Sequence, residues 1–167
     1  MPRPYTGTRD GLATGTRPGT KELARLTAKR FRTKNLGMWT NRTIHGTTKL
    51  SVHATGRAVD LGYKRRSDAL ALWNFLIANT AELGIEEIHD YAYKWPNQDP
   101  KDKTAWGAGY RCSRGEGMAG IKIFTATDNA GSPGGRWLHV CLSPAMADNP
   151  KLFRQAWIAA LRRSGLV

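Results

Sequence analysis

The segment S-V-H-A-T-G-R-A-V-D, residues 51–60, constrains the fold more than any other part of the chain. It places His53 and Asp60 seven positions apart, with Gly56 and the small Ala58 between them. Glycine lets a backbone turn sharply and approach its neighbours closely. A neutral imidazole and a carboxylate are two of the three protein ligands of an open zinc site. The segment therefore predicts most of such a site, provided that a third ligand lies downstream.

The composition is that of one basic globular domain. The 167 residues suffice for one core, and a hydrophobic content of 40% argues against disorder. A net charge of +13 predicts a polyanionic partner, such as nucleic acid, an anionic membrane surface or a bacterial wall with phosphate polymers. No apolar run is long enough to predict a membrane span, and residues 1–10 lack the apolar core of a signal peptide. We therefore expect synthesis in the cytoplasm and a separate route for any later exit.

The cysteine content excludes two classes of protein. Cys112 and Cys141 are the only cysteines, so neither a disulfide scaffold nor a four-cysteine zinc site can form. Two reduced thiols are expected in a reducing cytoplasm, and a single disulfide remains open.

Hydrophobic periodicity and turn residues predict a compact α+β domain over residues 20–167, preceded by an extended arm over residues 1–19. Thr20 and Pro150 are expected to begin the first and last helices. A small, mostly antiparallel sheet flanked by helices accounts for the pattern. Helices are predicted at 20–31, 67–84 and 150–163, and strands at 57–62, 85–93, 120–125 and 136–142. Residues 33–50 are predicted to be loop with short extended pieces, and residues 96–120 are predicted to be loop. The apolar face of the last helix is predicted to hold Leu152, Phe153, Trp157 and Leu161.

His139 is the candidate for the third ligand. Alternation in the strand W-L-H-V-C-L puts Trp137, His139 and Cys141 on one face, opposite the apolar residues between them. If His139 faces the same pocket as His53 and Asp60, the three leave a fourth zinc position for water. The residues alone also permit an ordinary reading, in which Asp60 caps a turn and both histidines are partly buried.

The spacing Ser51-x-His53-x-x-Gly56-x-Ala58-x-Asp60 resembles the signature of a family. The family comprises zinc D-Ala-D-Ala carboxypeptidases and L-alanyl-D-glutamate endopeptidases of peptidoglycan, within the lysostaphin/D-Ala-D-Ala-peptidase/hedgehog-type metallopeptidases. The resemblance covers residues 36–143, and the downstream match G-G-R-W-L-H-V is less specific. It implies a hedgehog/D-Ala-D-Ala-peptidase-like fold with His53, Asp60 and His139 as zinc ligands. It further implies that Arg42 binds a substrate carboxylate or stabilises the oxyanion. The sequence is equally consistent with Arg42 as a solvated surface residue.

One position departs from the family pattern. An acidic general base usually lies three residues before the third ligand, and here that position is Arg136, which cannot accept a proton near neutral pH. An alignment with Cys141 as third ligand puts Leu138 at the base position, so His139 is preferred and Cys141 stays an alternative. The base must then come from elsewhere. The candidates are Asp90 and His89, followed by Asp128 and Glu116, whereas Glu86 and Glu87 are predicted to form an exposed strand start.

The resemblance implies a zinc-dependent peptidase that cuts peptidoglycan stem peptides. A bacteriophage endolysin, or a virion-associated lysin that contacts other virion proteins, fits the absence of a signal peptide. Arg136 stands where family members have an acidic base, and this favours an alternative. In it the protein is a catalytically degenerate member of the family that serves as a structural or wall-binding part of a phage particle. A nucleic-acid-binding protein is a third possibility supported by charge alone, since no sequence-specific recognition motif is present.

Overall fold

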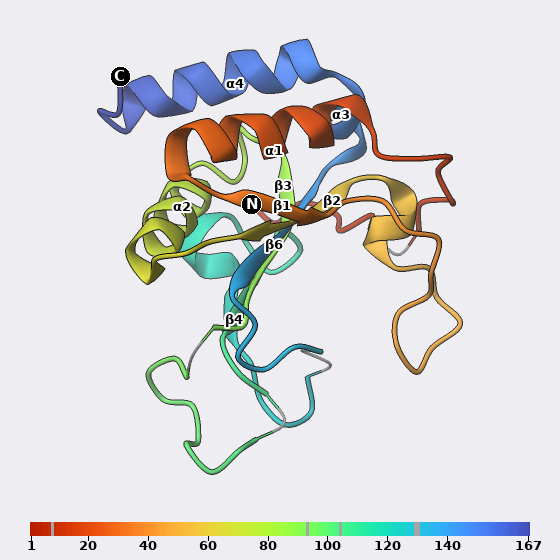
Figure 1. Ribbon diagram of the computed structural model, residues 1–167, viewed down its shortest axis with the longest axis vertical. Coiled ribbons are helices and arrows are strands. Elements are labelled where there is room, and N and C mark those ends of the chain that lie inside the picture. Colours follow the sequence, from red (N-terminus) through yellow and green to blue (C-terminus); the bar gives the residue numbers. More distant parts are fainter. Residues whose placement is uncertain (8, 93, 104, 129–130) are drawn as a thin grey trace.

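The computed structural model describes residues 1–7, 9–92, 94–103, 105–128 and 131–167. Within these residues six strands form one antiparallel sheet in the order β1-β2-β6-β3-β4-β5, and four α-helices accompany it (Figure 1). The strands are β1 (Lys34–Gly37), β2 (Ala58–Gly62), β3 (Ile85–Asp90), β4 (Ala108–Arg111), β5 (Ile121–Ile123) and β6 (Trp137–Leu142). The helices are α1 (Pro18–Phe31), α2 (Arg66–Ala78), α3 (Pro144–Asp148) and α4 (Pro150–Arg163), with short 3-10 helices η1 (Val52–Thr55) and η2 (Gly117–Gly120). The predicted α+β class is confirmed.

The helices cover one face of the sheet. Leu61 of β2, Ile88 of β3 and Val140 of β6 belong to one buried cluster with Leu23 of α1 and Trp157 of α4. Figure 1 shows α1 and α4 stacked on this side, while the long loops extend from the other side. Because strand side chains alternate between faces, the residues between these apolar ones point away from the helices.

Alternation in β6 is confirmed. Leu138, Val140 and Leu142 lie in the helix-side core. Trp137 and Cys141 instead pack in two smaller clusters on the opposite face. His139, which lies between them in the sequence, therefore faces away from the helices.

Helix boundaries differ from prediction where side chains bind the backbone. Helix α1 begins at Pro18, and the Thr20 hydroxyl donates to the Gly56 carbonyl 2.9 Å away instead of capping. Helix α2 ends at Ala78, after which the Asn79 side chain donates to the Phe75 carbonyl at 2.8 Å. Asparagine in this role competes with helix continuation, so residues 79–84 form turns rather than helix.

Other differences arise from tertiary pairing. The predicted loop 96–120 contains β4, which pairs with β3, and η2. Helix α3 was not predicted, and Leu152 of α4 is 39% exposed rather than part of its apolar face. Residue 93, the predicted end of the third strand, lies outside the described residues.

The N-terminal arm runs along the domain instead of extending from it. The Arg3 amide donates to the Cys112 carbonyl at 3.0 Å, and the Ala13 and Arg17 amides donate to the carbonyls of Ala54 and Gly56. The fully buried Arg57 guanidinium lies 3.0 Å from the Asp10 carboxylate and 3.3 Å from that of Glu86. The arm thus contacts the segment that carries His53, at Ala54, Gly56 and Arg57.

Over the part of the chain that the structure describes, none of the helices combines the length and apolarity needed to cross a bilayer.

Candidate metal centre

His53 is positioned by the tight turn of η1. The Ser51 hydroxyl accepts the His53 amide at 3.3 Å, and Gly56 closes the turn with φ of 74°. A Cβ at Gly56 would lie 2.4 Å from the Gly15 carbonyl oxygen, so only glycine fits between the turn and the arm. The His53 Nδ1 contacts the Met38 carbonyl, which can only accept a hydrogen bond. Nδ1 therefore carries the proton, and the lone pair of Nε2 faces the centre.

Asp60 and His139 are brought together by strand pairing. They are direct partners across β2 and β6, and His89 of β3 is the direct partner of His139 on its other side. Side chains of directly paired residues lie on the same face of a sheet. The sheet thus presents Asp60, His139 and His89 as one row, into which η1 brings His53.

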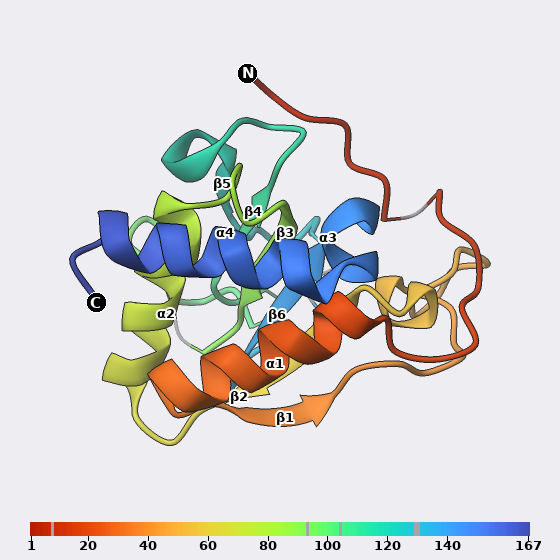
Figure 2. The same ribbon diagram turned by 90° about the horizontal axis from the view of Figure 1, so that it is seen from above.

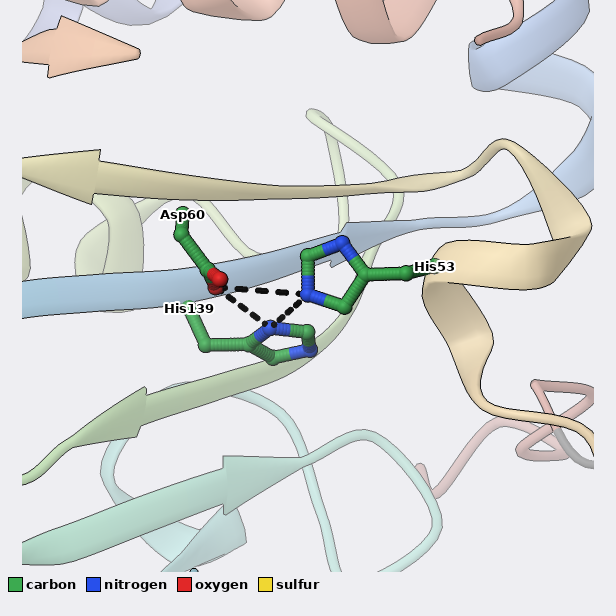
Figure 3. Close-up of side chains that lie close together, drawn as sticks. All are labelled: His53, Asp60 and His139. Carbon is green, nitrogen blue, oxygen red and sulfur yellow. Dashed lines mark hydrogen bonds and ion pairs between the residues drawn. The ribbon is translucent and has the colours of Figure 1, made fainter. Parts of the chain in front are cut away.

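Three ligand atoms form a nearly equilateral triangle (Figure 3). His53 Nε2 lies 3.2 Å from His139 Nδ1, His139 Nδ1 lies 3.0 Å from Asp60 Oδ1, and His53 Nε2 lies 3.3 Å from Asp60 Oδ1. In a tetrahedral zinc site with bonds of about 2.05 Å, two ligand atoms are separated by roughly 3.3 Å. A proton on one of these atoms can form a hydrogen bond along one edge of the triangle, but it cannot bridge all three edges. A single metal ion at the centre can bind all three atoms. The predicted His53, Asp60 and His139 group could therefore hold a metal ion.

The surroundings favour a negatively charged Asp60. Burial opposes its ionisation, but hydrogen bonds and charge interactions with His139 and His53 outweigh burial and hold the pKa of Asp60 well below its usual range. Both imidazoles are almost fully buried, at 5% and 7% exposure, so competition from bulk water is small. An anionic oxygen and two imidazole nitrogens at one point are a donor set that suits zinc.

Glu87 and His89 lie beside the triad, and the prediction that Glu86 and Glu87 form an exposed strand start is wrong. Both glutamates are buried, at 2% and 3% exposure. Glu87 Oε1 lies 3.7 Å from His139 Nε2, and its Oε2 lies 3.5 Å from His89 Nε2 and 2.9 Å from Arg111 Nε. Burial raises the pKa of Glu87, but the nearby His89, Arg111 and His139 hold it well below the usual range. An ionised carboxylate thus lies behind both histidines.

Tyr91 completes this side of the site. Its hydroxyl lies 2.7 Å from His89 Nδ1, and the His89 and His139 rings have centroids 5.4 Å apart. Burial, reinforced by the charges of Glu87 and Asp60, raises the pKa of Tyr91 above its ordinary value. Tyr91 therefore stays neutral and keeps its proton as a hydrogen-bond donor.

The structure does not bring Asp90 to the site. Asp90 is one position out of phase with Glu87 and His89, so it faces the helix side of β3. There it is fully buried and bound by the Arg66 guanidinium, with NH1 2.9 Å from Oδ1, and Trp95 Nε1 lies 3.3 Å from Oδ2. A carboxylate held in this way cannot reach a substrate at the triad, which corrects the expectation that Asp90 serves as base.

An open cleft of about 700 Å³ lies over the triad. The candidate Arg42 lies on its wall, with its carbonyl accepting a hydrogen bond from the Ser51 amide at 3.0 Å, and so lies in the same cleft as His53, Asp60 and His139. In the cleft Lys122 pairs with Asp128 at 2.7 Å. Arg42, Lys49 and Arg114 also line it and have no carboxylate partner among the described residues, and the cleft is therefore electropositive.

The remaining candidates lie elsewhere. Arg136 is exposed and donates to the Lys64 carbonyl outside the cleft. Glu116 binds Arg3, Thr80 and Tyr110 on another part of the surface. Both cysteines are free, and Cys141 is buried against Val52 and Ala58 rather than among the three ligand atoms.

Sequence reasoning missed Glu87 and Tyr91. Both are two residues from His89, and strand alternation alone would have placed them on its face. Tyr5 of the arm was also missed; it lines the cleft, with the Arg111 guanidinium 4.3 Å from its ring centroid. No short-range signal links Tyr5 to the site, because the arm reaches it only by tertiary packing.

No protein-family model, curated protein or solved structure matches this chain.

Proposed function

We propose that this protein is a zinc-dependent peptidase that cleaves the stem peptides of bacterial peptidoglycan. The observation that supports it best is the triangle of His53 Nε2, Asp60 Oδ1 and His139 Nδ1, with edges of 3.0–3.3 Å, on the floor of an open cleft. Three protein ligands leave one position free, which is the arrangement of catalytic rather than structural zinc sites.

Each of the two candidate histidine ligands has a partner that fixes its orientation. The Met38 carbonyl binds Nδ1 of His53, and the carboxylate of Glu87 faces Nε2 of His139. Such partners set the tautomer of a ligating histidine and raise its basicity. A zinc ion held here would supply a water of pKa near 7 and would polarise a substrate carbonyl.

His89 is the side chain best placed to move a proton. It lines the cleft and is 19% exposed, whereas the side chain of Glu87 behind it is 4% exposed. Glu87 lies 3.5 Å from Nε2 and can stabilise the protonated imidazole. Because Nδ1 accepts the Tyr91 hydroxyl, a proton from the cleft would reach His89 through that hydroxyl, which gives its own proton to Nδ1 and takes up the new one. His89 and Glu87 together would then serve as the general base, in place of the acidic residue that family members have at the position of Arg136. Of the two residues that the sequence favoured as general base, we therefore retain His89 and not Asp90.

The cleft charge suits an acidic peptide. Arg42 and Lys49 lie on one wall and can bind a substrate carboxylate, and a guanidinium can do so through two hydrogen bonds. Stem peptides of peptidoglycan carry free carboxylates. Together with the motif of residues 51–60, this supports a hedgehog/D-Ala-D-Ala-peptidase-like fold and a role as a phage endolysin or virion-associated lysin that acts at the wall.

Metal analysis paired with a peptidoglycan digest tests the proposal. Protein purified without chelator is expected to carry one zinc per chain, and His53→Ala is expected to lose it. His45→Ala, an exposed histidine on the same cleft, is the matched control and should keep zinc. Release of new amino groups from purified peptidoglycan measures the activity. Protein without zinc, or zinc content unaffected by His53→Ala, would refute the site.

A catalytically degenerate structural or wall-binding phage protein is the second candidate. The observation in its favour is Arg136 at the position of the usual base, outside the cleft and bound to the Lys64 carbonyl. Stoichiometric zinc without any release of amino groups, in both wild type and His89→Ala, would select this candidate.

A further inference from the structure

Helices α1 and α4 form a basic surface on the side of the sheet opposite the metal centre. They lie next to each other (Figure 2). The rings of Phe31 and Trp157 are 6.1 Å apart, and Arg154 Nε lies 2.6 Å from Glu22 Oε1. Both helices begin near α3, so they run in the same direction. Their outer sides and the two following cations of α1 constitute what we call the cationic helix face. Its exposed members are Lys21, Arg25, Lys29, Arg30, Arg32, Lys34, Lys151, Arg154, Arg162 and Arg163.

The charge on this face is largely uncompensated. Residues 18–34 and 150–163 contain these ten cations and a single acidic residue, Glu22. Glu22 is buried and already bound by Arg25 and Arg154. Arg163 also pairs with Glu82, which leaves most of the positive charge facing solvent.

Helix stability does not account for this charge. Cations in a last helical turn interact favourably with the helix dipole, which explains Lys29, Arg30 and Arg162. Lys151, however, lies in the first turn of α4, where a positive charge is unfavourable, and neither helix has an acidic residue in its first turn. The pattern fits a surface that binds an anion along its whole length.

The spacing of the cations follows the helix axes. Lys21, Arg25 and Lys29 recur every four residues, so they form one stripe about 12 Å long at a rise of about 1.5 Å per residue, and Arg32 follows at the end of the helix. Lys151, Arg154 and Arg162 form a second stripe of about 16 Å on α4. Two neighbouring stripes in the same direction suit a linear polymer with regularly repeated charges.

The rest of the face favours a polymer without bases or acyl chains. Phe31 and Trp157 are buried, at 6% and 2% exposure, so neither can stack on a nucleic-acid base. Leu152 and Ile158 are only 39% and 40% exposed, which is too little apolar surface for insertion into a bilayer. Phosphate charge alone matches what the face offers, and Arg and Lys both bind phosphate.

We propose that the cationic helix face binds a linear phosphodiester polymer of the bacterial wall, such as a polyol-phosphate chain. The choice of this partner rests on the proposed function, which puts the protein at the wall. Because α1 and α4 cover the sheet face opposite His53, Asp60 and His139, a bound polymer leaves the cleft free. The face would hold the protein on the wall while stem peptides enter the cleft.

Equilibrium binding to purified poly(glycerol phosphate), measured at 50 and 200 mM salt, tests this proposal. The face variant carries Lys21→Gln, Lys29→Gln, Arg30→Gln and Lys151→Gln. A control variant with the same net charge carries substitutions to glutamine at four exposed cations elsewhere: Arg9, Lys64, Lys101 and Lys103.

The face variant is expected to bind at least tenfold more weakly at 50 mM salt. Its slope of log affinity against log salt should fall by about three, because each lost contact removes roughly 0.7 for a flexible chain. The control variant should retain the wild-type affinity within about threefold. Zinc content and circular dichroism of both variants should match the wild type.

Three results would overturn the proposal. Equal losses in both variants would show that net charge alone matters, and absence of wild-type binding would show that the face binds no such polymer. Tighter binding to a single-stranded DNA with the same number of phosphates, or to phosphatidylglycerol vesicles, would assign the face to another partner. Polymer binding by protein that lacks zinc and activity would support the face and refute the peptidase.

Discussion

Replacing Glu87 by glutamine is expected to weaken zinc binding about ten- to a hundredfold while the protein stays folded. Glu87 Oε1 lies 3.7 Å from Nε2 of His139, on the side of the ring away from the ligand atom. Two unit charges at that distance interact by roughly 4.5 kcal/mol at an effective dielectric constant of about 20. Only part of the charge of a bound ion resides on the imidazole, so we expect a loss of about 1.4–2.7 kcal/mol, equivalent to that range of affinity.

The neighbouring residue provides a matched control. Glu86 is buried to the same extent as Glu87, but its carboxylate accepts hydrogen bonds from Thr6 and lies 3.3 Å from Arg57 instead of beside His139. Glu86→Gln is therefore expected to lower the free energy of unfolding and to leave the zinc affinity within about threefold of the wild type. Competition against a zinc-binding dye at pH 7 measures both affinities, and urea unfolding measures stability.

Zinc affinity of Glu87→Gln equal to that of the wild type would show that the carboxylate of Glu87 does not support His139 as a ligand. An equal loss of zinc affinity in Glu86→Gln and Glu87→Gln would show that general destabilisation, rather than the contact with His139, weakens zinc binding.

Three other perturbations are predicted. Cys141→Ala should keep one zinc per chain by metal analysis, because the thiol is packed against Val52 rather than in the triad. Gly109→Ala should lower the free energy of unfolding in urea by about 1–3 kcal/mol, since a Cβ there would lie 2.7 Å from the Phe124 ring. Hydrogen bonds from Arg25, and then from a second arginine, lower the pKa of Glu22 from 4.5 to about 2. This stabilisation is present above pH 4.5 and lost as the pH falls towards 2, so acid titrations of stability should be flatter in Glu22→Gln.

Strand β6 and the turn at Gly56 were predictable because local rules decide them. One face of β6 is covered by helices, so its apolar residues had to alternate with His139. Gly56 has a positive φ and a close backbone neighbour, and each of these features requires glycine. The glycine in the sequence therefore indicated the turn. The sequence could therefore predict that His53, Asp60 and His139 form one group, provided that residues 51–60 and β6 face the same pocket.

The side chains around the ligands were less predictable, because distant residues determine their burial. The sequence predicted that Glu86 and Glu87 form the polar, exposed start of a strand. Their burial is possible because Arg57 pairs with Glu86 and Arg111 pairs with Glu87. His89 and Asp90 were equivalent candidates in the sequence. Only the register of β3 against β6 shows that His89 faces His139.

The row of side chains across the sheet also has a consequence for the order of folding. Asp60 and His139 are 79 residues apart, and they meet only when β2 and β6 pair at the centre of the sheet. Closing such a long loop is slow and costs chain entropy, so the unfolded chain contains no preformed ligand set. Capture of a metal ion by His53, Asp60 and His139 would then follow sheet formation rather than nucleate it. Zinc would therefore slow unfolding of the finished protein and leave the rate of refolding almost unchanged.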